Sequence, residues 1–343
     1  MSEKTVATPP PLAKKDFQTD QEVRWCPGCG DYAILNAVQS VFPKLGIPRE
    51  KFVVVSGIGC SSRLPYYVNT YGFHTIHGRA PAVATGIKLA NPELEVWIGT
   101  GDGDALSIGG NHFIHTIRRN VGVKILLFNN RIYGLTKGQY SPTTPIGQKN
   151  KSSPFGTVER PMNGLAVALA CGATFAAASV DVYAKHLQEV LIRAAAHKGT
   201  AYVEIYQNCN VFNDGAFEDF TDKNLRDDTN LVLEHGKPMI FGKNRDRGIR
   251  LNGVNPEVVR LGNGAAEKDL LVHDEKNGAL AGILSRFTFP EFPMPLGVIR
   301  SVEDTPFETR VHDQARQLTS MLGQGKLKDL LYAEDLWEVK PRS

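Results

Sequence analysis

Short apolar, β-branched runs alternate with longer amphipathic segments between residues 31 and 207. The runs that predict strands are Lys51–Ser56, Glu95–Thr100, Lys124–Asn129, Thr174–Val180 and Ala201–Gln207. The segments that predict helices are Asp31–Val41, Pro81–Ala90, Gly109–Arg119, Asn163–Cys171 and Val182–His197. Strands that alternate with helices indicate βαβ units and a mostly parallel sheet with helices on both faces. The predicted fold class is therefore α/β.

The pattern weakens on either side of this region. Residues 1–20 begin Pro-rich and predict a flexible N-terminal arm, and residues 21–215 predict one binding domain. Residues 216–343 predict an irregular extension, in which the charged run Lys243–Arg250 indicates a solvated loop. The closing helices expected near Asp313–Leu322 and Lys326–Tyr332 have too few apolar residues for a core of their own. We expect this extension to pack on the domain or on a partner chain.

Composition narrows the class of protein. The 343 residues include 39 basic and 36 acidic side chains, and a net charge of +3 gives no indication of nucleic-acid binding. The longest apolar stretch, Leu165–Val180, is too short and too interrupted to cross a membrane, and the start lacks the apolar core of a secretory signal. We therefore expect a cytoplasmic enzyme that acts on small molecules. In a reducing compartment its five cysteines are metal ligands or reactive thiols rather than disulfides.

Two polar motifs directly follow neighbouring predicted strands. Gly101-Asp102-Gly103-Asp104 comes after VWIGT, and Asn129-Asn130 comes after KILLF. In an open parallel sheet, ligands bind beyond the carboxyl ends of the strands. Glycines allow the backbone to approach a phosphate, while carboxylate and amide oxygens suit Mg²⁺. The pair of motifs predicts a magnesium–diphosphate site.

A GDG turn followed by Asn-Asn at this separation resembles the signature of thiamine diphosphate enzymes. The resemblance implies that Asp102, the Asn130 side chain and the Ile132 carbonyl hold Mg²⁺, and that the cofactor diphosphate supplies further oxygens.

Four cysteines form the second candidate site. Cys26 and Cys29 make a Cys-x₂-Cys pair, Cys60 follows one predicted strand, and Cys209 follows another. Four thiolates suit an iron–sulfur cluster or a structural zinc ion. A zinc ribbon lacks its second Cys-x₂-Cys here, and a thioredoxin-like dithiol leaves Cys60 and Cys209 unexplained. The fifth, Cys171, is predicted to be a small buried hydrophobe.

The cysteines, GDGD and NNRIYGLTKGQYSPTT together resemble the β subunits of the 2-oxoacid:ferredoxin oxidoreductases, from about Trp25 to Asp214. This resemblance implies a thiamine diphosphate-binding fold of the diphosphate (PP) type and a [4Fe-4S] cluster on Cys26, Cys29, Cys60 and Cys209. It also implies a set of cofactor-binding residues: Ile58, Gly59, Ser61, His77, Gly101, Gly103, Asp104, Ala105, Tyr133, Gly134, Leu135 and Thr136.

The segment from Ser61 to Glu95 closely resembles the members of that family that use 2-oxoglutarate. A dicarboxylate substrate needs cationic partners, because a buried carboxylate must be paired. We expect Arg63 and Lys137 to bind the substrate carboxylates and His74 to serve as a further catalytic residue. Ser61 and His77 are expected to face the diphosphate.

The implied reaction is oxidative decarboxylation of 2-oxoglutarate with coenzyme A to succinyl-CoA and CO₂, with electrons passing through the cluster to ferredoxin, or its reverse. The pyrimidine-side Glu is expected on a separate α subunit, in an αβ or (αβ)₂ enzyme. Pyruvate or another 2-oxoacid is the alternative substrate. A non-oxidative thiamine decarboxylase would carry its pyrimidine domain in the same chain, and a zinc-ribbon scaffold would need neither GDG nor Asn-Asn.

Overall fold

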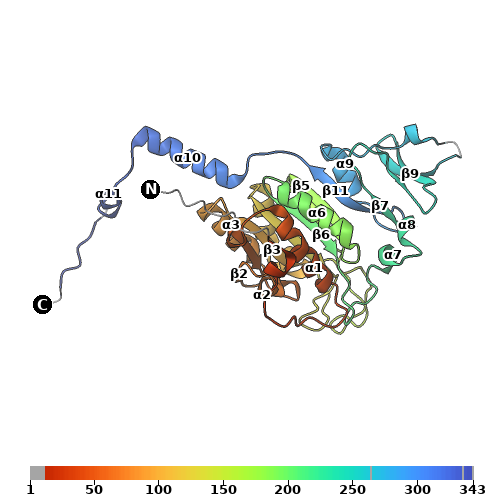
Figure 1. Ribbon diagram of the computed structural model, residues 1–343, viewed down its shortest axis with the longest axis horizontal. Coiled ribbons are helices and arrows are strands. Elements are labelled where there is room, and N and C mark those ends of the chain that lie inside the picture. The colour runs from red at the N-terminus through yellow and green to blue at the C-terminus, as the bar shows by residue number, and fades with distance from the viewer. Residues whose placement is uncertain (1–11, 263–264, 334–335, 342–343) are drawn as a thin grey trace, which may run out of the picture.

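An eight-stranded sheet forms the centre of the molecule (Figure 1). The computed structural model describes residues 12–262, 265–333 and 336–341. In spatial order the strands are β2 (Tyr71–His74), β1 (Phe52–Ser56), β3 (Glu95–Gly101), β4 (Val123–Asn129), β6 (Ala201–Tyr206), β5 (Phe175–Val180), β11 (Met294–Ser301) and β7 (Asn230–Val232). Neighbouring strands are parallel except β11 and β5, which run antiparallel. The predicted mostly parallel α/β sheet is confirmed.

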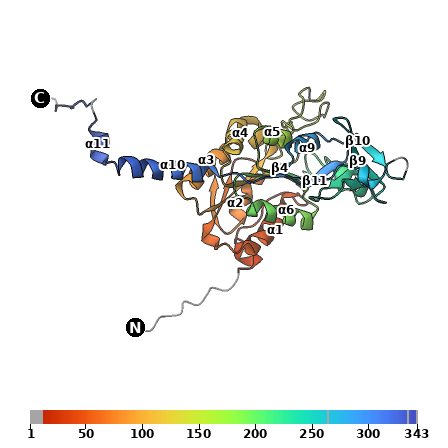
Figure 2. The ribbon, with the colours of Figure 1, turned by 90° about the horizontal axis from the view of Figure 1, so that it is seen from above.

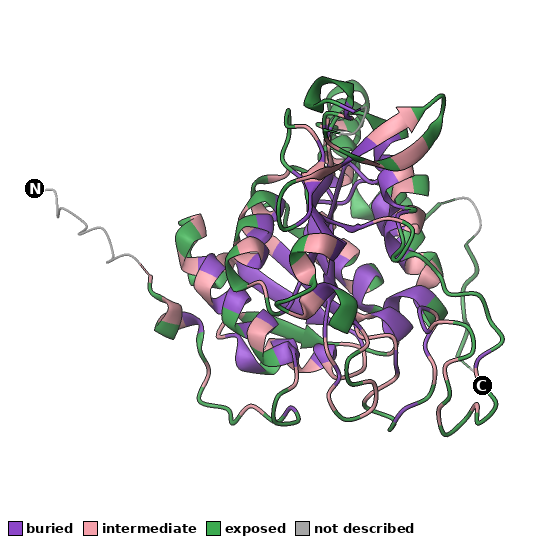
Figure 3. Ribbon diagram, turned by 90° about the vertical axis from the view of Figure 1, so that its right-hand side faces the viewer, coloured by how far each residue is buried: buried purple, intermediate pink, exposed green. Residues whose placement is uncertain are grey.

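Helices cover both faces of this sheet (Figure 2). One face carries α1 (Asp31–Val41) and α6 (Ala184–Ala196), and the other carries α3 (Ala80–Ala90), α4 (Gly110–Arg118), α5 (Gly164–Ala170) and α9 (Gly278–Leu284). Separate apolar clusters fill the two layers, so buried residues concentrate in the strands and in the inward sides of the helices (Figure 3). Single-turn helices α2 (Leu64–Tyr67), α7 (Glu218–Thr221) and α8 (Arg226–Thr229) lie in the connections.

The N-terminal prediction needs correction within the described residues. Residues 1–11 of the expected arm lie outside them, but Lys14–Phe17 forms a short 3₁₀ helix. Phe17 is fully buried, with its ring 5.6 Å from the rings of Phe42 and Phe52. This aromatic contact makes the end of the arm part of the core.

The part after residue 215 is more regular than the sequence indicates. β11 and β7 complete the main sheet, and β8 (Ile240–Phe241), β9 (Arg247–Asn252) and β10 (Asn255–Arg260) form a second, antiparallel sheet. The charged run predicted as a loop is a loop only up to residue 246. Its remainder is strand β9, because Arg250 pairs across the sheet with Glu257 at 2.7 Å.

The last helices leave the body of the molecule. In α10 (Phe307–Leu322), the Phe307 amide donates to the Asn120 carbonyl, and Glu308 Oε2 accepts from the Gly122 amide at 3.0 Å. His312 of α10 still lies 2.9 Å from the Leu89 carbonyl, but the end of α10 and α11 (Leu327–Leu331) project outward (Figure 1), with apolar side chains such as Leu322 and Leu330 exposed. Docking of this tail on a partner chain stays a prediction. No helix in the described part of the chain is long and apolar enough to span a membrane.

Candidate functional site

Loops from the carboxyl ends of four neighbouring strands, β1, β3, β4 and β6, meet at one edge of the sheet. A cavity of about 160 Å³ lies among the first three of these loops. It is lined by every residue expected to bind the cofactor except Ala105, together with Cys60, Asp102, Asn130 and Ile132. Ala105 is instead buried in the core beneath it. A larger, open groove of about 700 Å³ lies between α6, α8 and β8, away from these motifs.

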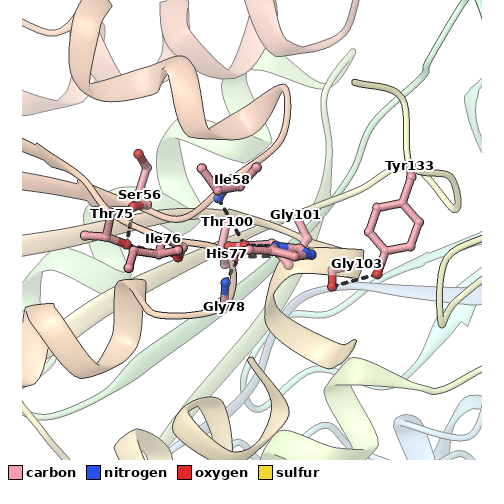
Figure 4. Close-up of polar contacts among 11 residues, drawn as sticks. Ser56, Ile58, Thr75, Ile76, His77, Gly78, Thr100, Gly101, Gly103 and Tyr133 are labelled. Atoms are coloured by element: carbon pink, nitrogen blue, oxygen red, sulfur yellow. Dashed lines mark hydrogen bonds and ion pairs between the residues drawn. The ribbon is translucent and has the colours of Figure 1, made fainter. Parts of the chain in front are cut away.

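Asp104 joins three segments of the cavity wall. Its Oδ1 accepts hydrogen bonds from the Ile58 amide at 3.0 Å, the Gly78 amide at 2.7 Å and His77 Nδ1 at 2.6 Å (Figure 4). Its Oδ2 accepts from Thr100 Oγ1 at 2.7 Å. Because both oxygens are occupied, Asp104 organises the loops rather than coordinating a cation. The bond to Nδ1 leaves Nε2 of His77 as the ring nitrogen that a ligand can reach.

Asp102 is the carboxylate positioned for a metal. It is 2% exposed, and its Oδ2 accepts from Ser141 Oγ at 2.5 Å and from Thr143 Oγ1 at 2.6 Å. Burial raises the pKa of Asp102, and the two hydroxyl hydrogen bonds oppose that shift. Both side-chain donors act on one oxygen, which leaves Oδ1 as the oxygen for a hard cation.

The two asparagines after β4 have different environments. Asn129 points into the core, where its Nδ2 donates to Glu204 Oε1 at 2.7 Å, and its Oδ1 accepts from the Arg131 amide at 3.2 Å and lies 3.1 Å from Thr143 Oγ1. Asn130 lines the cavity, and its Oδ1 accepts from the Ile132 amide at 3.2 Å. Asn130 is thus placed to contribute an oxygen ligand, while Asn129 supports the segment that holds Asp102.

The cavity wall contains a buried hydroxyl that could donate a hydrogen bond to a diphosphate. The hydroxyl of Ser61 is buried and has no hydrogen-bond partner among the described residues. This oxygen lies beside Gly101, 3.5 Å from where a Cβ on that glycine would be. An unpaired buried hydroxyl costs free energy unless a ligand supplies an acceptor. The site therefore fits thiamine diphosphate with Mg²⁺ on Asp102, Asn130 and Ile132.

Four cysteines lie beside this cavity. A Cβ on Gly134, which lines it, would lie 3.5 Å from Cys209 Sγ and 3.6 Å from Cys60 Sγ. Burial raises the pKa of the Cys60 thiol to about 12, and negative charge on Asp31, Cys209 and Cys26 adds to the shift. Burial also raises the pKa of Cys29. Such thiols lose their protons when bound metal cations offset the negative charge of the resulting thiolates.

The cysteines of the described residues are not gathered around one point. Among residues 12–262, 265–333 and 336–341, no three His, Cys, Asp or Glu side chains are close enough to share one ion. Zinc would require all its thiolates about 2.3 Å from one centre. A cluster of several irons spreads its four thiolates around a larger core. A [4Fe-4S] cluster on these cysteines stays a prediction.

The expected substrate residues lie outside the lining of this cavity. Arg63 Nη1 donates to the Arg24 carbonyl at 3.0 Å, and its charge lowers the pKa of Cys60. His74 lies on the exposed edge strand β2, with Nδ1 2.8 Å from the Tyr66 hydroxyl. Lys137 is exposed with φ of 76°, on the same loop as Tyr133. Their roles stay predictions.

Sequence reasoning missed several residues of the site. Asp31 and Phe128 also line the cavity. Asp31 is 1% exposed, and burial together with the Asp181 carboxylate raises its pKa to about 7. The only feature of the sequence that points to Asp31 as a site residue is its position directly after CPGCG. Ser141 and Thr143 lie in the SPTT segment of the motif, but nothing in the sequence indicates that they contact Asp102.

Comparisons with known proteins agree with this geometry. Residues 57–205 match the thiamine pyrophosphate enzyme, C-terminal TPP binding domain. The chain is 48% identical over 337 residues to 2-oxoglutarate oxidoreductase subunit KorB of Mycobacterium tuberculosis, covering 97% of this chain and 90% of that protein. It is 49% identical over 198 residues to 2-oxoacid:ferredoxin oxidoreductase 1, subunit beta, of Aeropyrum pernix, covering 58% and 62% of the two chains.

A solved structure is similar over nearly the whole chain. It is a 2-oxoglutarate:ferredoxin oxidoreductase from Magnetococcus marinus with 2-oxoglutarate, coenzyme A and succinyl-CoA bound. The TM-score is 0.77 at 34% identity, and the match covers 94% of this chain and 96% of that one. The resemblance drawn from the motifs is confirmed: this chain belongs to the β subunits of the 2-oxoacid:ferredoxin oxidoreductase family, and so to an oxidoreductase.

Proposed function

We propose that the chain is the β subunit of a 2-oxoglutarate:ferredoxin oxidoreductase. The proposed reaction converts 2-oxoglutarate and coenzyme A to succinyl-CoA and CO₂, passes electrons through a [4Fe-4S] cluster to ferredoxin, and can also run as reductive carboxylation. The observation that carries it is the contact at Gly134, because this glycine lines the cavity and lies beside the thiols of Cys60 and Cys209. The names of the M. tuberculosis and M. marinus proteins support 2-oxoglutarate as the substrate.

The chain's own residues have distinct tasks in this proposal. Asp102, Asn130 and the Ile132 carbonyl hold Mg²⁺, and Ser61 and His77 contact the diphosphate. Thiamine diphosphate, when bound there, supplies the electron sink for loss of CO₂. Cys26, Cys29, Cys60 and Cys209 hold the cluster on the other side of Gly134. The short separation of the two sites suits transfer of single electrons.

A partner chain is needed to complete the site. The cavity of about 160 Å³ is smaller than the roughly 300–1,000 Å³ of pockets that enclose a cofactor. We infer that an α subunit covers the remainder and supplies the pyrimidine-side Glu, in an αβ or (αβ)₂ enzyme. The cytoplasmic location also stays a prediction.

The test is a reconstituted assay with the purified α partner. We expect 2-oxoglutarate to reduce ferredoxin only when coenzyme A is present, with succinyl-CoA as product. A broader 2-oxoacid specificity is the second candidate, because the A. pernix relative is named for 2-oxoacids in general. Faster turnover of pyruvate would favour that candidate, and no turnover of any 2-oxoacid would reject the proposal.

A further inference from the structure

We propose that the side-chain amide of Gln207 donates a hydrogen bond to the Cys29 thiolate and thereby raises the reduction potential of the cluster. This inference rests on the proposed function, since it requires a cluster on the four cysteines. Gln207 directly follows β6 and precedes Cys209 by two positions. Its Nε2 lies 3.3 Å from Cys29 Sγ. Gln207 is thus a positioning residue, which acts on the cluster through a ligand.

The amide is held in one orientation. Gln207 is 1% exposed, and its backbone amide donates to the Asn129 carbonyl at 2.9 Å. Its Nε2 also donates to the Asn208 carbonyl at 2.5 Å. The Asn208 carbonyl can only accept, so the nitrogen rather than the oxygen must face it, and an iron-bound thiolate is likewise an acceptor. One hydrogen is directed to the carbonyl and the other to the sulfur.

The opposite end of the amide shows that this orientation has a cost. Gln207 Oε1 is buried and has no hydrogen-bond partner in the described part of the chain. A buried acceptor left unpaired is rare in folded proteins and calls for a compensating interaction. A charge-assisted bond from Nε2 to an iron-bound thiolate provides one, since such bonds are stronger than neutral ones.

The neighbouring backbone is shaped to admit the glutamine. A Cβ on Gly30 would lie 2.8 Å from Gln207 Cγ and 1.9 Å from Asp181 Oδ2. Any larger residue at position 30 would force these side chains away from the Cys-x₂-Cys turn. The glycine therefore allows Gln207 to reach Cys29.

The direction of the effect follows from charge. Reduction adds an electron to the cluster and increases the negative charge on its sulfur ligands. A fixed N–H donor stabilises that charge more in the reduced state, and hydrogen bonds to the sulfurs are among the main determinants of cluster potential. The buried carboxyls of Asp31 and Asp181 nearby have the opposite effect whenever they are ionised. Gln207 supplies a donor without a charge.

The experiment is a redox titration of the assembled αβ enzyme. The electron paramagnetic resonance signal of the reduced cluster is measured at each potential. Gln207→Met keeps the length of the side chain and removes the donor, so we expect normal iron content and a midpoint potential shifted to more negative values. The matched control is Asn208→Ala, since the Asn208 amide bonds Asp214 at 2.8 Å rather than a thiol. We expect it to leave the potential unchanged. Equal potentials in the wild type and Gln207→Met would overturn the inference.

A second measurement covers the case in which Gln207→Met loses its cluster. In wild-type enzyme labelled with ¹⁵N at glutamine side chains, pulsed electron paramagnetic resonance should detect a labelled nitrogen coupled to the reduced cluster. Absence of that coupling overturns the inference without any variant. Wild-type protein that assembles with its partner but contains no iron and sulfide would instead contradict the proposed function.

Discussion

Thr143 Oγ1 lies 2.6 Å from Asp102 Oδ2, although 41 positions separate the two residues. The same hydroxyl is 3.1 Å from Asn129 Oδ1, and Asn129 in turn donates to the buried carboxylate of Glu204. The expected magnesium ligand is therefore oriented by a segment that follows the Asn-Asn motif. This relationship makes the SPTT segment part of the cofactor site without placing it in the cavity.

Thr143→Val removes the hydroxyl and keeps the shape. A hydrogen bond to a charged group contributes about 1.5–3 kcal/mol. We therefore expect Mg²⁺-dependent affinity for thiamine diphosphate to fall roughly 10- to 150-fold, measured by titration calorimetry. Thr143→Ser should retain most of the affinity, and Asp102→Ala should abolish it while the cluster survives. Equal affinity in the valine and serine variants would show that the hydroxyl does not orient Asp102.

Replacing a cluster ligand should remove iron selectively. Cys209→Ala should lose iron and sulfide, because Cys209 Sγ lies with Cys60 at the wall formed by Gly134. Cys171→Ala is the matched control, because Cys171 ends α5 and packs against the other apolar cluster of the sheet than Cys29 and Cys60 do. Elemental analysis and the absorbance near 400 nm measure the content. A full complement of iron in Cys209→Ala contradicts the ligand set.

The isolated chain should not turn over any 2-oxoacid. Its cavity leaves much of a thiamine cofactor uncovered, and the pyrimidine-side Glu is expected on the α subunit. Addition of the α subunit should restore CoA-dependent activity. The reduction of ferredoxin measures that activity. Steady turnover by the β chain alone would refute the two-chain enzyme.

Substrate preference should depend on a cation near the cofactor. Lys137→Met and Arg63→Met should reduce kcat/KM for 2-oxoglutarate by roughly 10- to 150-fold and affect pyruvate much less, because pyruvate lacks the distal carboxylate. Arg79→Met is the control, since Arg79 contacts His112. If both test variants lose the two substrates equally, the cations serve the shared carboxylate or the fold.

Stability should fall in acid partly through His197. Its Nε2 lies 2.8 Å from Thr174 Oγ1, and burial together with the charge of Lys124 lowers its pKa from 6.5 to about 4. The unfolded chain binds a proton at His197 below pH 6.5, whereas the folded chain does not until about pH 4, so stability decreases across that interval. His197→Gln should flatten the decrease in urea unfolding curves. Parallel pH profiles for the two proteins would rule out this contribution.

Much of the site could be predicted because its residues follow strands in the sequence. Asp102 and Asn130 come directly after β3 and β4, which are neighbours in the sheet. Their positions in the sequence therefore predict that the two side chains lie near each other at one edge of the sheet. Thr143 could not be predicted in this way, since its contacts come from a loop whose path depends on packing. Asp31 could not either, since it begins helix α1 and follows no strand. The second sheet was missed because alternating Arg side chains resemble a solvated loop until Glu257 pairs with Arg250.

The antiparallel strand β11 lies far along the chain from its partner β5, and this separation affects both folding during translation and the choice of protein fragments for expression. It pairs with β5 through Gly297 and Ala178. At roughly 5–20 residues per second, a ribosome needs on the order of 6–24 s to cover the roughly 120 positions between them. During that interval the nascent chain presents one edge of β5 without its neighbour, and such edges recruit strands from other molecules. A fragment that ends near residue 215 would keep that edge permanently, so we expect a well-behaved fragment of this protein to include β11 as far as Ser301.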